Sequence, residues 1–305
     1  MIESFTITNH LGESLELILA DPDSSGLAIT SVTGLGQVTA KANLTQLAGS
    51  DYSVENSAVL GERNIVFKIK YWGTDIEESR HKCDRIFPTK KNVTIVAKTD
   101  HRELMATGIV EKNEPDIFSD NSACQVSIVC ADPFWYTLNL TDIPFGGIEP
   151  LFEFPFHADI SVDEGEETHT IEVGNIRLVK EKSIYYTGET EVGITLNIHA
   201  IGSVRNFVIY NVDLRQQISI DDSIINTLTG GYIQNGDDII ISTIKTQKYA
   251  RLIRNGVEYN IINALGKTRD WFELSGGDNL FSYSASEGEY DMVIDIKYRI
   301  SYKGL

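Results

Sequence analysis

Residues 291–302, "DMVIDIKYRISY", alternate between apolar and mostly polar side chains along their whole length. The apolar positions are Met292, Ile294, Ile296, Tyr298, Ile300 and Tyr302. The polar positions between them include Asp291, Asp295, Lys297, Arg299 and Ser301. A period of two places every second side chain on one face of a β-strand, whereas a helix would scatter the same residues around its axis. The stretch therefore predicts a strand with one buried face, and the same alternation recurs around residues 194–198.

Two Asn-Gly pairs separate candidate strands, in "QNGD" from Gln234 and in "RNGV" from Arg254. Asn-Gly is the preferred pair for a type I′ hairpin turn because both central positions need a positive φ. Strands joined by such turns predict an antiparallel β-sandwich over residues 158–305. In "LSGGDNLFSYSA", we interpret Gly276 and Gly277 as a scaffold turn before another strand, since glycine adopts conformations that side chains forbid.

The first half of the chain is also rich in strands, with "ESLELILA", "NIVFKIKYW", "NVTIVAKT" and "ACQVSIVCA" as candidates. One helix is predicted over residues 75–87, "DIEESRHKCDRIF", where a capping aspartate and an acidic first turn precede basic residues. Its buried stripe would hold Ile76, Cys83, Ile86 and Phe87. The polar, small-residue stretch from Ser31 to Gly61 predicts a long excursion from the domain body with a function of its own.

The prolines suggest where the chain divides. All seven lie at or before Pro155, and Pro144, Pro150 and Pro155 occur together in "DIPFGGIEPLFEFPF". A chain of 305 residues is long enough for two domains that each bury a core. We therefore predict a mainly β protein with a first domain over residues 1–140, a linker over 141–157 and a second domain over 158–305.

Charge and composition exclude several classes of protein. The 44 acidic and 26 basic residues give a net charge of -18, which opposes binding to the phosphates of nucleic acid. No run approaches the roughly eighteen apolar residues that span a bilayer. The N-terminal "MIESFTITNH" has neither the basic nor the apolar segment of a secretory signal. We expect a protein made in a cytoplasm, without membrane insertion or sequence-specific nucleic-acid binding.

Several stretches begin like functional motifs but do not complete them. The segment from Asp21 to Gly26, "DPDSSG", has the first half of a calcium loop, but Val32 stands where the closing glutamate belongs. The segment "GLGQVT", residues 34–39, lacks the third glycine and the lysine of phosphate loops. The acidic run from Asp163 to Glu167 is typical of a solvated loop, and the six histidines show no ligand spacing. We predict no catalytic, cofactor-binding or metal-binding residues.

The three cysteines, Cys83, Cys124 and Cys130, are odd in number and lack the paired spacing of a zinc or redox motif. On a strand, Cys124 and Cys130 would share a face but lie roughly 20 Å apart at about 3.3 Å per residue. They are too far apart to bridge each other there, so buried free thiols are predicted.

The order of the parts along the chain is more informative than any single motif. The sequence begins with "ITNHLGESLEL", continues with Arg63 before "NIVFKIKY", and then has the predicted helix, with Arg80 and Arg85, running into "IFPTKKNVTI". A strand then ends in an aspartate-proline-aromatic sequence at residues 132–135, and the second half contains "LSGGDNLFSYSA" and ends in "YRISYKGL". This order resembles that of the distal tail protein family of long-tailed bacteriophages.

The resemblance implies a tail-tube-like first domain with one helix, whose strands join around a central pore, and a galectin-like β-sandwich as the second domain. It also implies a homohexameric ring that connects the tail tube protein to the baseplate hub, located at the tail tip of a virion assembled in the host cytoplasm. Insertions in the second domain hold a receptor-binding protein in some members. The excursion from Ser31 to Gly61 is then assigned to contacts with a neighbouring subunit.

Two other functions are weighed against this structural role. A carbohydrate-binding module for adhesion to the host surface could use Trp271, Phe272 and tyrosines as stacking platforms. The sequence lacks the His-x-Asn-Pro-Arg motif of true galectins, and "HAIG" stands at His199. A cell-wall glycosidase would need a carboxylate pair whose separation in space the sequence does not give. We expect a protein that is not an enzyme.

Overall fold

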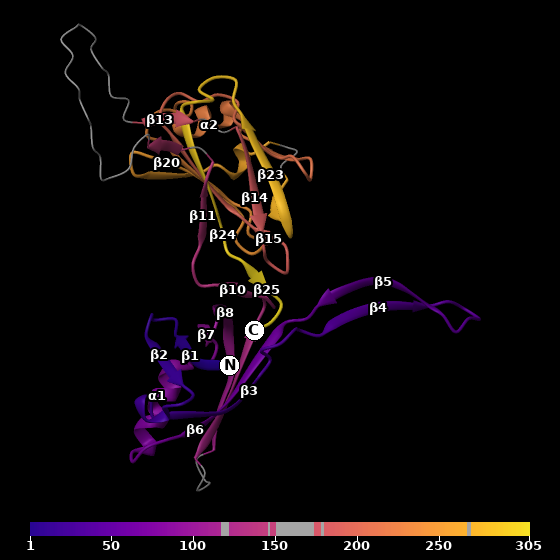
Figure 1. Ribbon diagram of the computed structural model, residues 1–305, viewed down its shortest axis with the longest axis vertical. Helices are drawn as coiled ribbons and strands as arrows, with labels where there is room; N and C mark the ends of the chain where they lie inside the picture. Colours follow the sequence, from indigo (N-terminus) through magenta and orange to yellow (C-terminus); the bar gives the residue numbers. More distant parts are fainter. Residues whose placement is uncertain (117–121, 146, 151–173, 178–179, 267–269) are drawn as a thin grey trace, which may run out of the picture. The chain divides into compact units, whose positions relative to one another are not determined.

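The computed structural model describes the chain except for residues 117–121, 146, 151–173, 178–179 and 267–269. The chain forms two compact units (Figure 1). Unit 1 comprises Met1–Asn139, Gly188–Thr190 and Arg299–Leu305, and unit 2 comprises Leu140–Thr187 and Glu191–Tyr298. The described parts of both units are mainly β-strand, as the sequence predicted.

Unit 1 is built on an antiparallel sheet in the order β2-β1-β7-β8-β9-β6-β3. Its strands are β1 (Ile2–Thr8), β2 (Ser14–Ile18), β3 (Leu27–Thr33), β6 (Arg63–Tyr71), β7 (Asn92–Thr99), β8 (Glu103–Asp116) and β9 (Ala123–Cys130). Strand β10 (Trp135–Thr137) pairs with both β8 and β25 (Ser301–Tyr302). Strands β4 (Ala40–Gln46) and β5 (Ser53–Leu60) pair only with each other, and the short 3-10 helix η1 (Pro22–Ser24) precedes β3. The four strands expected in this half are confirmed.

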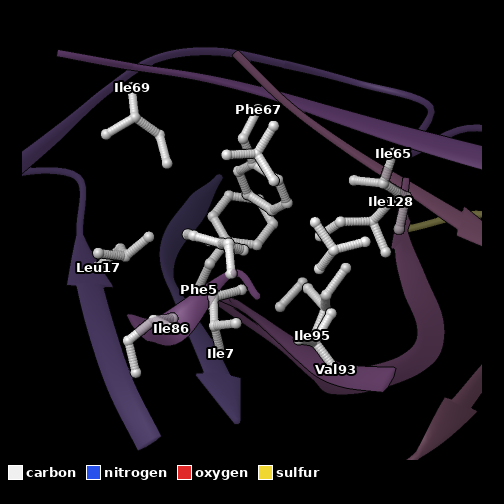
Figure 2. Close-up of a cluster of buried hydrophobic side chains, with 14 of the residues drawn as sticks. Phe5, Ile7, Leu17, Ile65, Phe67, Ile69, Ile86, Val93, Ile95 and Ile128 are labelled. Atoms are coloured by element: carbon white, nitrogen blue, oxygen red, sulfur yellow. The ribbon is translucent and has the colours of Figure 1, made fainter. Parts of the chain in front are cut away.

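The core of unit 1 lies on one face of this sheet (Figure 2). Phe5 and Phe67 meet edge to face with their ring centroids 5.2 Å apart. Every second residue of β6 is buried, which is the period that a half-buried strand requires. The aliphatic side chains labelled with the two rings in Figure 2 come from β1, β2, β6, β7, β9 and helix α1 (Ile76–Ile86), so the core depends on elements that are distant in sequence.

Helix α1 (Ile76–Ile86) confirms the prediction for residues 75–87. Asp75 caps it by accepting a hydrogen bond of 2.9 Å from the backbone N–H of Glu78, and Glu77 and Glu78 complement the positive end of the helix dipole. Cys83 and Ile86 are buried, and so is Phe87 just beyond the helix. The prediction was wrong for Ile76, which is 38% exposed because it lies in the first turn, outside the buried stripe.

Unit 2 contains two larger antiparallel sheets. The first has the order β11-β24-β16-β19-β20-β21: β11 (Thr141–Pro144), β24 (Met292–Tyr298), β16 (Thr195–Ala200), β19 (Asp238–Ser242), β20 (Tyr249–Arg254) and β21 (Val257–Asn260). The second has the order β14-β23-β17-β18: β14 (Glu181–Tyr186), β23 (Gly277–Ser284), β17 (Val208–Asn211) and β18 (Gln216–Ser219). Two short pairs complete the strands, β12 (Gly147–Pro150) with β13 (Gly174–Arg177) and β15 (Val192–Gly193) with β22 (Glu273–Leu274).

The inward faces of the two larger sheets pack against each other as a sandwich. Tyr186 on β14 meets Tyr298 on β24 with ring centroids 5.8 Å apart, and Phe145, which follows β11, meets Tyr283 on β23 at 5.4 Å. These edge-to-face contacts join the two layers through buried aromatic rings. The unit also contains the 3-10 helix η2 (Ile262–Ala264).

Helix α2 (Asp222–Thr229) in unit 2 was not predicted. Asp221 caps its start by accepting from Ser223 and Ile224, and Gly230 ends it in the left-handed conformation at φ +72°. Both capping signals are present in the sequence, but the segment between them is short and contains two isoleucines and two threonines, which favour strands.

The two Asn-Gly pairs differ in outcome. Asn255 and Gly256 both have positive φ, and the β20–β21 hairpin they connect is confirmed. The prediction was wrong for "QNGD", where only Gly236 has a positive φ and the segment leads from α2 into β19. There the side chain of Asp237 accepts from the backbone N–H of Gln234, which stabilises a different turn.

The alternating stretch 291–302 does not form one continuous strand. It forms β24 as far as Tyr298, and β25 begins at Ser301. Beyond Ile300 the burial pattern reverses, so that Ser301 is buried and Tyr302 is half-buried. The reversal occurs because β24 belongs to unit 2, whereas β25 pairs with β10 in unit 1.

The chain passes between the compact units at four places, after Asn139, Thr187, Thr190 and Tyr298, so the units do not have the predicted domain bounds. Residues 141–144 of the predicted linker form β11 in the first sheet of unit 2, while residues 151–157 lie outside the described part. The last seven residues, 299–305, return to unit 1.

Candidate interaction surfaces

The stretch from Ser31 to Gly61 contains a two-stranded ribbon formed by β4 and β5. The strands pair antiparallel from Ala40 opposite Leu60 to Gln46 opposite Ser53, with one irregularity between Asn43 and Leu44. The sequence predicted a long excursion from the domain body, and within it the small polar residues form an antiparallel ladder. In Figure 1 the ribbon extends from β3 away from the sheet of its own unit.

Every residue of β4 and β5 is exposed. The exposed residues include large apolar side chains, among them Tyr52 at 77%, Val59 at 60% and Leu44 at 58%. Leu47, Val54 and Leu60 are also exposed. Charged residues are sparse in this segment, with Lys41, Asp51 and Glu55 as its members.

An isolated two-stranded ribbon is marginally stable in water because neither face covers a core. Here both outer edges also lack a further strand among the described residues, leaving backbone groups available for pairing. Exposed apolar side chains together with free strand edges are typical of a surface that another chain covers.

The base of the ribbon is held by Arg63, which is 1% exposed at the start of β6. Its Nη1 donates to the carbonyls of Gly34 and Gly36, both at 2.6 Å. Its Nε donates to the carbonyl of Pro133 at 2.7 Å, and its Nη2 donates to that of Lys303, also at 2.7 Å. The guanidinium thus joins the loop before β4, the segment before β10 and the C-terminal residues. Burial lowers the pKa of Arg63.

The C-terminal residues complete this joint. The backbone N–H of Leu305 donates to the carbonyl of Leu35 at 3.1 Å. Gly34 has φ +83°, and a Cβ there would lie 1.9 Å from the carbonyl oxygen of Asn64. In the segment that begins like a phosphate loop, Gly34 therefore allows two backbone segments to approach closely at the base of the ribbon.

In unit 2, a row of side chains crosses the outer face of the four-stranded sheet. Glu181 lies opposite Ser282, Ser282 opposite Tyr210, and Tyr210 opposite Gln217. All four line a hollow of about 380 Å³. This is the solvent-facing side, because Ile209 and Ile218 of the same strands point into the core.

A second hollow, of about 670 Å³, lies by the start of α2. Val208 and Ser219, which pair with each other on β17 and β18, contribute to its wall. The guanidinium of Arg205 lies 3.2 Å from the centre of the Tyr232 ring, and both residues line the hollow. Hydrogen bonds from Ser223 lower the pKa of Asp221, which is already engaged as the helix cap.

The aromatic residues proposed as sugar platforms have different positions. Phe272 is fully buried and packs against Phe281 at 5.9 Å, so the prediction was wrong for this residue. Trp271 is half-buried, with the Lys248 ammonium 5.2 Å from its ring centre. Tyr210 and Tyr232 line the two hollows instead. Their positions could not be predicted from the sequence because they depend on which distant segments meet in the fold.

The stretch that begins like a calcium loop has a structural role in the described part of the chain. Asp21–Gly26 spans η1 and the turn into β3, and the acidic run Asp163–Glu167 lies outside the described residues. Gly277 has φ +98° and begins β23, where the side chain of Asn279 hydrogen-bonds the backbone of Ser275. In the described part of the chain, no three His, Cys, Asp or Glu residues gather as metal ligands, and no helix is long and apolar enough to cross a bilayer.

Comparisons with known proteins place the whole chain in one fold. Neither the models of known protein families nor the curated proteins match this sequence. Among solved structures, SPP1 Dit (gp 19.1), described as a paradigm of the hub adsorption apparatus in phages that infect Gram-positive bacteria, matches with a TM-score of 0.62 at 14% identity. The match covers 97% of this chain and 99% of that one. The chain has the distal tail protein fold.

Two chains from the phage P2 baseplate in its activated conformation match the same fold. The structure with Ca has a TM-score of 0.51 at 13% identity, covering 97% of this chain and 98% of that one. The structure with Sr has a TM-score of 0.51 at 12% identity, with 97% of each chain covered. At such identities the agreement concerns the distal tail protein fold and extends over both units.

The residues that carried the sequence resemblance have structural roles within this distal tail protein fold. Asp132 accepts from the backbone N–H of Phe134 at 3.1 Å and from the hydroxyl of Tyr136 at 2.7 Å, which fixes the aspartate-proline-aromatic turn. Trp135 is fully buried, with the Arg63 guanidinium 5.4 Å from its ring centre. Arg85 on α1 has a solvent-exposed side chain.

Proposed function

We propose that this chain is a structural component of a phage tail, forming a homohexameric ring that connects the tail tube to the baseplate hub. Its partners would be copies of itself, the tail tube protein and a hub protein, and its location would be the tail tip of the virion. This role requires protein surfaces rather than catalytic residues. The proposal is supported by the fold, which matches distal tail and baseplate structures along nearly the whole chain.

The observation that carries the proposal is the exposed ribbon of β4 and β5. Its apolar side chains, Tyr52 and Val59 among them, face solvent within a single chain, and its strand edges are unpaired in the described part. A rigid base held by Arg63 would aim the ribbon at a constant angle. Repeated head-to-tail contacts of this kind close into a ring when the rotation between copies fits.

The proposal is tested by the assembly state of the purified full-length chain. Mass photometry and negative-stain electron microscopy at micromolar concentration should show hexamers and sixfold rings. The same measurements are repeated with tail tube protein added, because the ring could require that surface. Monomers alone under both conditions would contradict the ring.

The outer face of the β14-β23-β17-β18 sheet supports a second candidate function, binding of a host-surface glycan. The row of Ser282, Tyr210 and Gln217 offers hydroxyl and amide groups beside an aromatic ring. The neighbouring hollow adds Tyr232 with Arg205. Such mixed polar and aromatic surfaces suit sugars, whose hydroxyls need hydrogen bonds and whose ring faces are apolar.

Glycan binding is tested with an array of neutral cell-wall oligosaccharides and with a polyol-phosphate polymer as a separate probe. Tyr210→Ala should weaken binding about tenfold if the ring stacks on the sugar. Tyr185→Ala is the matched control, because Tyr185 is 68% exposed on the same sheet but does not line either hollow. Equal binding by both variants, or no binding by the parent chain, would exclude this face as a glycan site.

A further inference from the structure

Two of the three thiols meet inside unit 1. Cys83 on α1 and Cys124 on β9 have their Sγ atoms 3.4 Å apart, although they are 41 positions apart in sequence. Cys83 is 0% exposed and Cys124 is 4% exposed. The third thiol, Cys130, is buried at the far end of β9, roughly 20 Å along the strand at about 3.3 Å per residue.

The fold holds this pair in place from both sides. The buried face of α1 carries Ser79, Cys83 and Ile86 against the sheet. Cys124 shares the inward face of β9 with Val126 and Ile128. Since a disulfide needs its sulfurs about 2.05 Å apart, the two Sγ atoms must come closer by about 1.3 Å for the bond to form.

The two thiols of the pair differ in how readily they lose a proton. The hydrogen bond to Cys124 and burial both raise the pKa of the Cys83 thiol. The S–H of Cys83, as donor, lowers the pKa of Cys124. Cys124 is thus the sulfur better suited to act as the attacking thiolate.

We propose that Cys83 and Cys124 form an internal disulfide when the folded protein meets a small-molecule disulfide as oxidant. The Cys124 thiolate attacks one sulfur of the oxidant, breaking its S–S bond and releasing one thiol. The Cys83 sulfur then attacks Cys124 and releases the second thiol. Two electrons pass to the oxidant, and the two protons from the cysteines end on its two thiols. The inference is independent of the proposed function.

Because both sulfurs are buried, the oxidant reaches them when α1 opens locally, and the reaction should be slower than that of an exposed thiol. The product would tie the helix to β9 and close a long loop. Cross-linking a loop of this length restricts the unfolded chain, so the midpoint of thermal unfolding should rise by roughly 5–15 °C.

The experiment treats the folded full-length chain with oxidised glutathione and counts free thiols after denaturation. We expect the count to fall from three to one, and peptide mapping under non-reducing conditions should join the peptides that contain Cys83 and Cys124. Three remaining thiols after prolonged treatment, or linkage spread over the three possible pairings, overturns the proposal.

Variants provide a matched control within the same strand. Cys130→Ala should still form the link and show the same thermal shift on oxidation. Cys83→Ala and Cys124→Ala should each show neither, with oxidised and reduced samples unfolding together. If a variant is too unstable to purify, the peptide map of the parent chain alone still decides the pairing.

Discussion

At the scale of single residues, two buried guanidinium groups are accommodated in different ways. Arg254 in unit 2 pairs with Asp237, donating from Nε to Oδ1 at 2.8 Å and from Nη2 to Oδ2 at 2.5 Å. Arg63 in unit 1 instead donates to four backbone carbonyls. A buried charge is tolerated only when its hydrogen bonds are satisfied, so both arrangements fix the segments that they join.

Replacing Arg63 should strongly destabilise unit 1. Arg63→Ala leaves four buried carbonyls without their charged donor, which we expect to cost about 3 kcal/mol of unfolding free energy. Arg63→Lys should recover only part of the lost stability. Its ammonium restores a charged donor but cannot reach all four acceptors as the planar guanidinium does. Denaturant unfolding measures both. Arg85→Ala on α1, whose side chain is 64% exposed, is the control and should change stability by less than about 0.5 kcal/mol.

Asp295 on β24 should make stability depend on pH. Burial raises the pKa of Asp295, a nearby Asp142 raises it further, and Lys297 opposes the shift. A raised carboxyl pKa means that the folded state binds the proton more tightly, so stability falls as pH rises from the ordinary value of 3.8 through the folded value. Asp295→Asn should therefore raise the thermal midpoint at pH 7, with the gain shrinking as pH falls.

The comparison for Asp295→Asn is Asp51→Asn in the exposed turn between β4 and β5. The Asp51→Asn substitution should leave the thermal midpoint unchanged both at pH 7 and at acidic pH. A gain for Asp295→Asn that persists unchanged at acidic pH would point to packing rather than to the charge.

At the scale of elements, α1 and the β4–β5 ribbon show opposite relations to the core. The helix buries Cys83 and Ile86 against the sheet, and its stability comes from this packing as well as from its cap. The ribbon buries none of its residues. Its sequence is thus free of the constraints of a core, and its apolar residues are available for a partner.

A charge on the ribbon should disrupt assembly without unfolding the chain. Val59 and Ser57 are exposed residues of β5 that point to the same face, opposite Lys41 and Asn43 respectively. Val59→Asp should weaken subunit association about tenfold or more, because it places a charge within an apolar contact. Ser57→Asp adds the same charge at a polar position. Sedimentation velocity compares the two, and equal association of both would show that the apolar side chain is not used.

At the scale of the whole molecule, the chain leaves unit 1 after Asn139, rejoins it briefly over Gly188–Thr190 and returns to it for good at Arg299. The backbone N–H of Thr137 donates to the carbonyl of Ile300 at 3.0 Å, so the point where the chain leaves unit 1 lies beside the point where it returns. β25 completes the pairing of β10, and Lys303 accepts from Arg63. Unit 2 is therefore an insertion within unit 1 rather than a domain appended to it.

This insertion predicts which truncation folds. A chain ending at Asn139 lacks β25 and the Lys303 carbonyl and should be markedly less stable than a chain in which residues 1–139 continue through a short glycine-serine linker into residues 299–305. The second version should fold and, under the proposed function, assemble into rings without unit 2. Thermal unfolding and electron microscopy compare the two. Equal stability would show that the C-terminal residues contribute nothing to unit 1.

The sequence by itself determined the local elements of this protein. Alternating apolar residues located β6, β7 and β9, the Asp75 cap located α1, and the pair Asn255–Gly256 located a hairpin. These features depend on residues that are close in sequence, and their steric and hydrogen-bonding preferences act wherever the segment lies.

Only the tertiary structure decided which distant residues meet. It buried Phe272, placed Cys83 beside Cys124, assembled the row through Tyr210 and returned the last residues to Arg63. The same alternation that predicted one strand over 291–302 was divided between two units, with its burial reversed at Ser301. Such outcomes depend on which strands pair across the fold. Paired strands can be far apart in the sequence, and the local pattern of either strand does not identify its partner.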